Sequence, residues 1–176
     1  MRIRDIRALA GPNIYSHDPV LVMRLDLEDL YQKESCEFAG FNDRLLNLLP
    51  GLHEHYCGLG RRGGFVERLR GGTYFGHVVE HVALELTDAV GISVNRGKTV
   101  STNVPGEYLV AVAFKSERGM RQLLRIAVEF VEAVLRDEPY ELEPKLDEAR
   151  QIVARYELGP STRAIVDAAT RRGSLL

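Results

Sequence analysis

Apolar residues that alternate with polar ones, or that form short continuous runs, predict the strands of a small sheet. The expected strands are Ile3 to Leu9, Val20 to Leu27, Ile92 to Asn95 and Glu107 to Lys115, with the last two forming a hairpin. The final strand has the clearest alternation, because its bulky side chains occupy every second position. Its other face carries smaller residues, which would let a helix pack closely there, namely Leu109, Ala111 and Ala113.

Helical periodicity fills much of the remaining chain, and glycine, proline and polar residues mark where the helices begin and end. Residues 28–40 have no clean period and are expected to form a loop or an irregular turn of helix. Asn42, Thr73 and Ser116 are placed to cap helices. The expected helices cover about residues 42–49, 65–70, 74–90, 117–138, 144–156 and 161–172. The pattern indicates an α+β fold, in which a small mixed or antiparallel sheet is covered by helices and followed by a helical C-terminal extension.

Composition narrows the class of protein without changing this picture. The 176 residues are 45% hydrophobic and 27% charged, as in an ordinary globular chain, and the length suits one domain. A net charge of −2 and a pI near 6.2 give no reason to expect nucleic acid or an anionic membrane as partner. No apolar segment approaches the length of a membrane span. The two cysteines, Cys36 and Cys57, and the charged N-terminus favour a cytoplasmic protein.

His77, Glu80 and His81 form the order His-x-x-Glu-His, which occurs in the inverted zinc peptidases. On a helix the two histidines are four residues apart, so both imidazoles can reach one zinc ion. Glu80 lies beside them, where its carboxylate can take a proton from a metal-bound water. At about 100° per residue, the three residues fall outside the apolar arc that runs from Phe75 to Val90. They are therefore not expected to face the core.

Other interpretations of the histidines remain open. His and Glu on an outward helix face can simply be solvated, and a zinc site needs a third protein ligand that the motif does not place. His53, His55 and Cys57 alternate, so on a strand they would share one face and could ligate a metal. The leucine-rich segment before them favours a helix instead, on which this spacing splays the side chains.

Two glycine-rich segments raise the question of anion binding. Residues 58–64 carry Arg61 and Arg62, so backbone N–H groups and guanidinium groups there could meet an anion. Gly97-Lys98-Thr99 does not form a nucleotide-binding loop, because five residues separate Gly97 from the preceding glycine and such a loop needs four. The sequence therefore predicts no ATP site and no residues that bind an organic cofactor.

Several separated motifs resemble the N-terminal domain of the cyanophycin synthetases, and the resemblance covers nearly the whole chain. A further stretch from Leu158 to Gly173 resembles the passage of that family into its ATP-grasp domain. The other motifs are Gly11-Pro12-Asn13, Val22 to Leu30, Arg62-Gly63-Gly64-Phe65 and, above all, Gly72 to Leu86.

The resemblance implies a role with cyanophycin, a polyaspartate backbone that bears arginine side chains. Full-length members use an ATP-grasp domain to add Asp and a Mur-ligase-like domain to add Arg, and neither is present in these 176 residues. Residues 1–140 are expected to form the N-terminal domain, and residues 141–176 a helical linker toward the missing ATP-grasp domain. The implied partners are the polymer and these two catalytic domains. The oligomeric state stays open, a homo-oligomer included.

In the family this domain is associated with holding the growing polymer, and in some members with a zinc-peptidase-like site that cuts cyanophycin and supplies primers. His77 and His81 match the metal ligands of that site, and Glu80 matches its general base. The family pattern implies a third, carboxylate ligand near Ala113, where this strand has none. The nearest acidic residues in the sequence are Glu107, Glu117 and Glu129.

Three hypotheses follow. The leading one is a non-catalytic domain that anchors the polymer, since a zwitterionic polymer calls for a surface with both guanidinium groups and carboxylates. The second is a zinc-dependent hydrolase that cuts the same polymer, and the motif fits an active or a vestigial site. The third is a purely structural domain that packs against the ligase domains or against itself. The candidate polymer-binding residues are Arg61, Arg62, Arg68 and Arg70.

Overall fold

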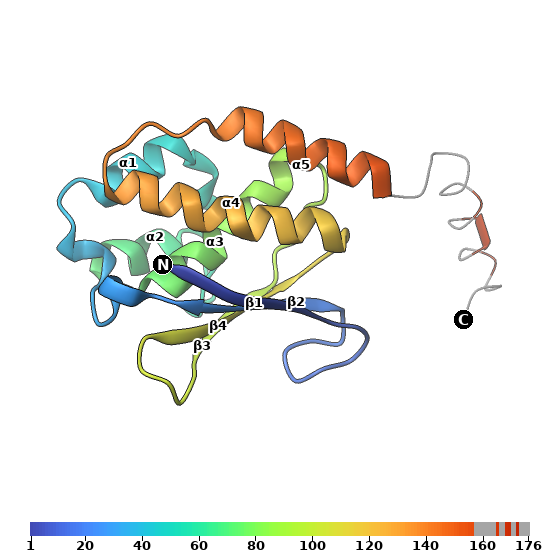
Figure 1. Ribbon diagram of the computed structural model, residues 1–176, viewed down its shortest axis with the longest axis horizontal. Coiled ribbons are helices and arrows are strands. Elements are labelled where there is room, and N and C mark those ends of the chain that lie inside the picture. Colours follow the sequence, from blue (N-terminus) through green and yellow to red (C-terminus); the bar gives the residue numbers. More distant parts are fainter. Residues whose placement is uncertain (157–164, 166–167, 170–171, 173–176) are drawn as a thin grey trace.

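The computed structural model describes residues 1–156, 165, 168–169 and 172, and it contains a four-stranded antiparallel sheet (Figure 1). The strands are β1 (Arg2–Leu9), β2 (Val20–Asp26), β3 (Gly97–Ser101) and β4 (Glu107–Ala113). Their order across the sheet is β1-β2-β4-β3, so β2 and β4 are central and β3 is an edge strand. The sheet and its helices confirm the α+β class.

Helices cover one face of the sheet (Figure 1). α3 packs on β3 and β4, α4 packs on α3 and β2, and α5 packs on α4. The expected helix at residues 161–172 lies largely outside the described residues. No described helix combines the length and the hydropathy that crossing a membrane requires. The helices are α1 (Phe41–Leu48), α2 (Gly64–Gly71), α3 (Phe75–Ala89), α4 (Glu117–Leu135) and α5 (Leu142–Tyr156), with short 3-10 turns at Glu28–Leu30, Ser35–Glu37 and Pro50–Glu54.

The core lies between the sheet and the two long helices α3 and α4. Met23 of β2 and Val110 and Val112 of β4 are fully buried there, in one cluster with the apolar residues of the helices. The expectation that a helix would pack on the smaller face of β4 is wrong, because Ala111 belongs to a second cluster with Val22. The bulky face supplies more apolar area, and each fully buried valine stabilises the fold by roughly 1.5–3 kcal/mol.

Three expected helix caps have different outcomes. Ser116 caps α4 as expected, since its hydroxyl accepts a hydrogen bond from the Gly119 N–H at 3.2 Å. Asn42 lies inside α1, after Gly40 as N-cap, and its amide donates to the Leu69 carbonyl. Thr73 does not cap α3 either, because Tyr74 is the N-cap and has no capping side-chain bond. The freed Thr73 hydroxyl takes part in the site described below.

The expected strand at Ile92 to Asn95 is wrong in position, since β3 begins only at Gly97. The preceding residues are held at the end of α3 instead. The Ile92 N–H donates to the Thr87 carbonyl, and the Val94 N–H donates to the Thr87 hydroxyl at 3.2 Å. Thr87 is fully buried, so these bonds are shielded from water and fix where the chain leaves the helix.

Candidate functional site

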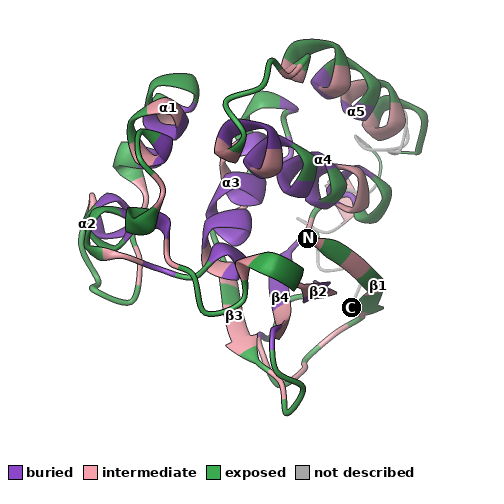
Figure 2. Ribbon diagram, turned by 60° about the vertical axis from the view of Figure 1, so that its left-hand side comes forward, coloured by how far each residue is buried: buried purple, intermediate pink, exposed green. Residues whose placement is uncertain are grey.

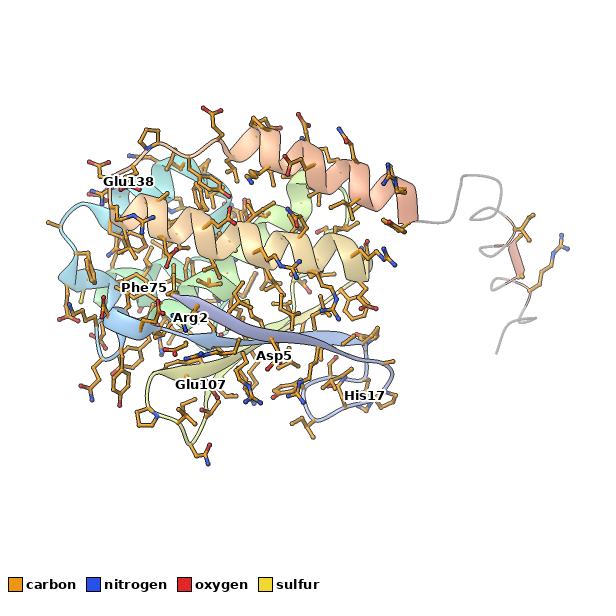
Figure 3. The ribbon with its side chains drawn as sticks, in the orientation of Figure 1. Arg2, Asp5, His17, Phe75, Glu107 and Glu138 are labelled. Carbon is orange, nitrogen blue, oxygen red and sulfur yellow. The ribbon has the colours of Figure 1, made fainter. Side chains whose placement is uncertain are left out.

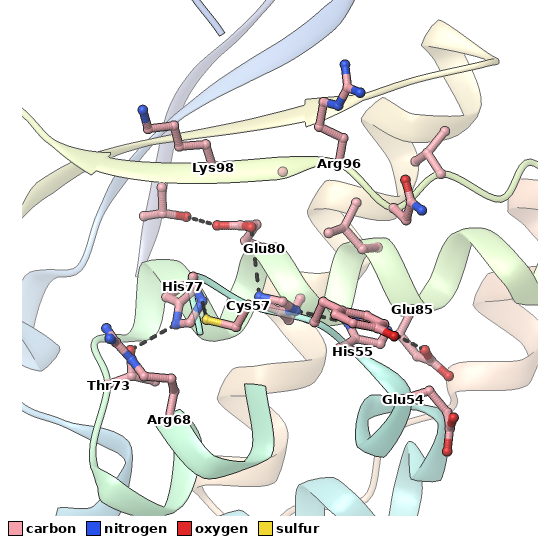
Figure 4. Close-up of a pocket in the computed structure, with 18 of the residues that line it drawn as sticks. Glu54, His55, Cys57, Arg68, Thr73, His77, Glu80, Glu85, Arg96 and Lys98 are labelled. Atoms are coloured by element: carbon pink, nitrogen blue, oxygen red, sulfur yellow. Dashed lines mark hydrogen bonds and ion pairs between the residues drawn. The ribbon is translucent and has the colours of Figure 1, made fainter. Parts of the chain in front are cut away.

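A cleft of about 990 Å³ opens between α3, the edge strand β3 and the segment that follows the Pro50–Glu54 turn (Figure 4). α3 is largely buried along its length (Figure 2), and the side that its apolar arc leaves free forms the floor of the cleft. His77, Glu80 and His81 therefore face the cleft rather than the apolar core. Only 5% of Glu80 and 4% of His81 is exposed, so the solvated interpretation is wrong for both residues.

Cys57, His77 and His81 form a cluster of potential metal ligands. One ligand atom from each lies within 4.8 Å of the others, and the Cys57 Sγ lies 3.5 Å from the His77 Nε2. A tetrahedral zinc ion with Zn–S near 2.3 Å and Zn–N near 2.0 Å would hold sulfur and nitrogen about 3.5 Å apart. A thiolate and two imidazoles are also a donor set that zinc prefers. The residues therefore fit a zinc ion.

The rings of the two histidines are held in place by their surroundings. The Thr73 hydroxyl lies 2.9 Å from the His77 Nδ1, which directs the Nε2 of that ring toward Cys57. Phe65 stacks on His81 with a centroid distance of 4.1 Å and an interplanar angle of 17°. Such partners fix the orientation of a ligand before a metal binds.

His81 is also held by a chain of hydrogen bonds through His55 to Glu85. The Glu85 Oε2 lies 2.7 Å from the His55 Nε2, and the His55 Nδ1 lies 2.9 Å from the His81 Nδ1. A carboxylate only accepts, so the Nε2 of a neutral His55 carries the proton and its Nδ1 accepts. His81 must then donate from Nδ1, and its Nε2 is left with a lone pair. The chain thus selects the tautomer of His81 that can bind a metal through Nε2.

Glu80 is placed beside the cluster without joining it. Its Oε2 accepts a hydrogen bond from the Thr99 hydroxyl at 2.6 Å, and its Oε1 lies 3.9 Å from the His81 Nε2. Burial raises the pKa of Glu80 from 4.5 to about 7, and the Thr99 hydrogen bond opposes that rise. A carboxyl group with a pKa near neutrality can both take up and release a proton, as a general base requires.

Burial keeps both histidines of the motif neutral. It lowers the pKa of His77 from 6.5 to about 4, with a smaller contribution from the charge of Arg68. It lowers the pKa of His81 to about 2, with contributions from His77 and His55. Neutral imidazole is the form that binds metals, so the site is ready for a ligand role at neutral pH.

Two glycines make room for the acidic side chains. At Gly97 of β3, an added Cβ would lie 2.8 Å from the Glu80 Oε1. At Gly51, an added Cβ would overlap the Glu85 carboxylate. Both carboxylates therefore lie so close to the backbone that only glycine, which has no side chain, fits at these two positions.

The third ligand expected from the acidic residues near β4 is not found among them. Glu107 lies on the sheet near Arg24 (Figure 3), Glu117 pairs with Arg121, and Glu129 accepts from Tyr140. Cys57 is the potential ligand that lies beside the two histidines instead. The helix favoured for the alternating His53, His55 and Cys57 is wrong beyond Glu54, because His55 is already extended at φ −71° and ψ 132°.

His53 is exposed and does not line the cleft, whereas His55 and Cys57 do. Only one of the four candidate polymer-binding arginines, Arg68, lines the cleft. Arg61 is paired with Glu67 and Arg62 with Glu54, all on the surface. Arg70 is exposed and lies outside the lining. The sequence thus missed Arg96 and Lys98, which line the cleft from β3.

Comparison with known proteins identifies the family of the chain. Residues 22–136 match the family model described as cyanophycin synthase-like N-terminal domain. The chain is 44% identical to a cyanophycin synthetase of Crocosphaera subtropica and 43% identical to one of Synechocystis, over 98% of its own length. A cyanophycin synthetase of Trichormus variabilis is 42% identical over the same share. The chain spans only 20% of the length of each of these three relatives.

Proposed function

Because this chain belongs to the family of cyanophycin synthase-like N-terminal domains, we propose that it binds cyanophycin and cuts it at a zinc-dependent site. The observation that carries the proposal is the convergence of Cys57, His77, His81 and Glu80 in one cleft. Cys57 lies 20 residues before His77 in the sequence, outside the helix that carries the other three residues. This convergence moves the hydrolase ahead of the anchoring hypothesis that the sequence alone favours.

Cys57, His77 and His81 would hold the ion and leave a position open for substrate, as catalytic zinc sites do. A zinc ion would supply Lewis-acid chemistry, polarising an amide carbonyl and lowering the pKa of water. Glu80 would remove a proton from the attacking water and deliver it to the leaving nitrogen. The amide C–N bond breaks while the oxygen of water joins the carbonyl carbon, so one proton moves through Glu80 and the atoms balance.

Anchoring of the polymer is a second function that the cleft itself supports. Its volume of about 990 Å³ is at the upper end of the range for ligand sites, which suits a branched chain. Glu54, Glu85 and Asp88 line it together with basic residues. A polymer unit with a guanidinium and a carboxylate can pair with both kinds of group. The basic residues in the lining are Arg68, Arg96 and Lys98.

The wider setting is proposed on the basis of the relatives. We place this chain in a larger ligase that makes cyanophycin, with residues 141–176 as the link toward an ATP-grasp domain and with a Mur-ligase-like domain as a further partner. Both cysteines are free thiols, which supports a reducing compartment such as the cytoplasm.

The test is to incubate the chain with cyanophycin in the presence of zinc, and separately with a chelator, and to follow polymer length and bound metal together. Cleavage that requires zinc is expected. Glu80→Gln should abolish cleavage and keep zinc, whereas His77→Ala should lose both. Glu67→Gln, on the exposed side of α2, is the matched control and should cleave normally.

The remaining outcomes separate the hypotheses. Binding of the polymer without cleavage under any metal condition would leave the anchoring function alone. Neither binding nor cleavage would leave a structural packing domain. Undiminished cleavage by Glu80→Gln would remove Glu80 from the mechanism.

A further inference from the structure

β3 presents an unpaired backbone edge to the cleft. It is the last strand of the sheet and pairs only with β4 among the described residues. The Ala113 N–H donates to the Arg96 carbonyl, and the Thr102 N–H donates to the Glu107 carbonyl. In an antiparallel pair the direction of the backbone groups alternates with each residue. Even-numbered residues of β3 therefore face β4, and the odd-numbered ones, Gly97, Thr99 and Ser101, direct their N–H and C=O groups away from the sheet.

These outward backbone groups have no partner among the described residues, since no backbone or side-chain hydrogen bond there uses them. An edge of this kind is a template for another strand. Gly97 and Thr99 line the cleft, so an added strand would lie inside it.

The face of β3 that carries the Thr99 side chain, and on which Gly97 leaves open space, lies toward α3. The Thr99 hydroxyl donates to the Glu80 carboxylate, and Gly97 has no side chain where Glu80 passes. The stretch of backbone that is open for pairing is therefore the stretch that lies against the proposed general base (Figure 4). A chain paired with it would run past Glu80 and the cluster of Cys57, His77 and His81.

Charge on the two sides of β3 also suits a chain with charged branches. The side chains of Arg96 and Lys98 project from the face of the strand opposite Glu80 (Figure 4). Lys98 is exposed and has no ion pair among the described residues, whereas Arg96 pairs with Asp18 at 3.2 Å. Glu54 and Asp88 also line the cleft. Successive side chains of an added strand point alternately to the two faces, so carboxylates and guanidinium groups can meet opposite charges.

We propose that β3 binds the main chain of the polymer as an additional strand, through the backbone groups of Gly97 and Thr99. This inference rests on the proposed function, because it takes cyanophycin as the ligand. A polyaspartate backbone has one N–H and one C=O per residue, which is what strand addition requires. Main-chain pairing would hold the polymer at Glu80 whatever the branch at each position, and the amides next to Glu80 would be those of the polyaspartate chain.

The test compares Thr99→Pro with Thr99→Val. Both variants lose the hydroxyl, but only proline loses the outward N–H, and proline is tolerated in an edge strand when its nitrogen faces outward. Binding of a fluorescently labelled cyanophycin oligomer to the metal-free chain is measured by anisotropy, and circular dichroism checks the fold. The Thr99→Pro variant should bind the oligomer about tenfold more weakly than the Thr99→Val variant, as loss of one backbone hydrogen bond predicts.

A second measurement alters the ligand and leaves the protein unchanged. Oligomers are N-methylated either at a main-chain amide or at the amide that joins an arginine branch. Main-chain methylation should weaken binding about tenfold and branch methylation should weaken it less. Equal binding by the proline and valine variants, or equal effects of the two methylations, would overturn the strand-addition inference alone. A complete lack of binding by the unaltered chain would overturn the proposed function as well.

Discussion

Glu80→Gln should stabilise the metal-free protein, and the gain should grow with pH. The substitution replaces a carboxyl group that is 5% exposed by a neutral amide of the same shape. The amide oxygen can still accept the hydrogen bond that the Thr99 hydroxyl gives at 2.6 Å. What changes is the charge, because glutamine has none to bury at any pH.

The magnitude follows from the pKa of Glu80, which burial raises from 4.5 to about 7. Below pH 4.5 the carboxyl group is protonated in the folded and the unfolded chain, and the substitution changes little. Between pH 4.5 and 7 the unfolded chain releases the proton while the folded chain retains it, so the stability of the native protein falls as pH rises. A shift of about 2.5 units corresponds to roughly 3 kcal/mol once the pH exceeds 7. Between pH 5 and pH 8 the variant should gain about 2 kcal/mol relative to the native protein.

The assay is urea unfolding followed by circular dichroism at pH 5 and pH 8, with a chelator present. The lowered pKa values of His77 and His81 destabilise the fold as pH drops below 6.5, but they do so equally in both proteins and cancel in the difference. Glu67→Gln serves as the control at an exposed site. A difference between the native protein and Glu80→Gln that stays constant from pH 5 to pH 8 would refute the argument that burial raises this pKa.

Three further predictions concern the surroundings of the site and the core. Glu85→Ala should weaken zinc binding at least tenfold in competition with a chromophoric chelator, because it removes the acceptor that fixes His55 and, through it, the tautomer of His81; unchanged affinity would argue against that chain. Gly97→Ala should slow cleavage at least tenfold and keep zinc bound, since the new methyl group displaces the Glu80 carboxylate, and normal turnover would show that Glu80 can work from another position. Arg44→Ala should lower the free energy of unfolding by about 1–3 kcal/mol in urea, since its guanidinium donates twice, at 2.8 and 3.0 Å, to the Val134 carbonyl at the end of α4; a smaller loss would mean that water replaces those bonds.

Most of the fold could be predicted because its signals are local. The apolar periodicity of α3 and the alternation of β4 each depend on neighbouring residues, and both elements form where expected. Errors arise where a side chain makes a hydrogen bond that the local pattern does not reveal. Thr73 could cap α3, but its hydroxyl hydrogen-bonds to the His77 ring instead. The chain after α3 could extend β3, but the hydroxyl of buried Thr87 accepts a hydrogen bond from the Val94 N–H there.

The site could be predicted only in part for the same reason. His77, Glu80 and His81 share one helix, so their spacing brings them together. Cys57 and His55 reach them only because the 3-10 turn ends at Glu54 and the backbone becomes extended. The alternation of histidines and cysteine was a usable signal, yet the leucine-rich segment before it favoured a continued helix. Pairing of His55 with Glu85 spans 30 residues, which no local pattern records.

The two segments that carry the ligand cluster, α3 and the segment around Cys57, differ in how strongly they are anchored to the rest of the fold. α3 is anchored in the core along its length, whereas the segment with Cys57 is extended and is followed by Gly58 and Gly60. Its backbone is tied by the Phe65 N–H to the His55 carbonyl at 3.4 Å and by the Gly60 N–H to the Cys57 carbonyl at 2.7 Å. Local opening of this short segment would withdraw one donor atom while the helix stays folded. The exchange rate of an ion held there would then match the amide hydrogen exchange of residues 55–60, and both would be faster than global unfolding.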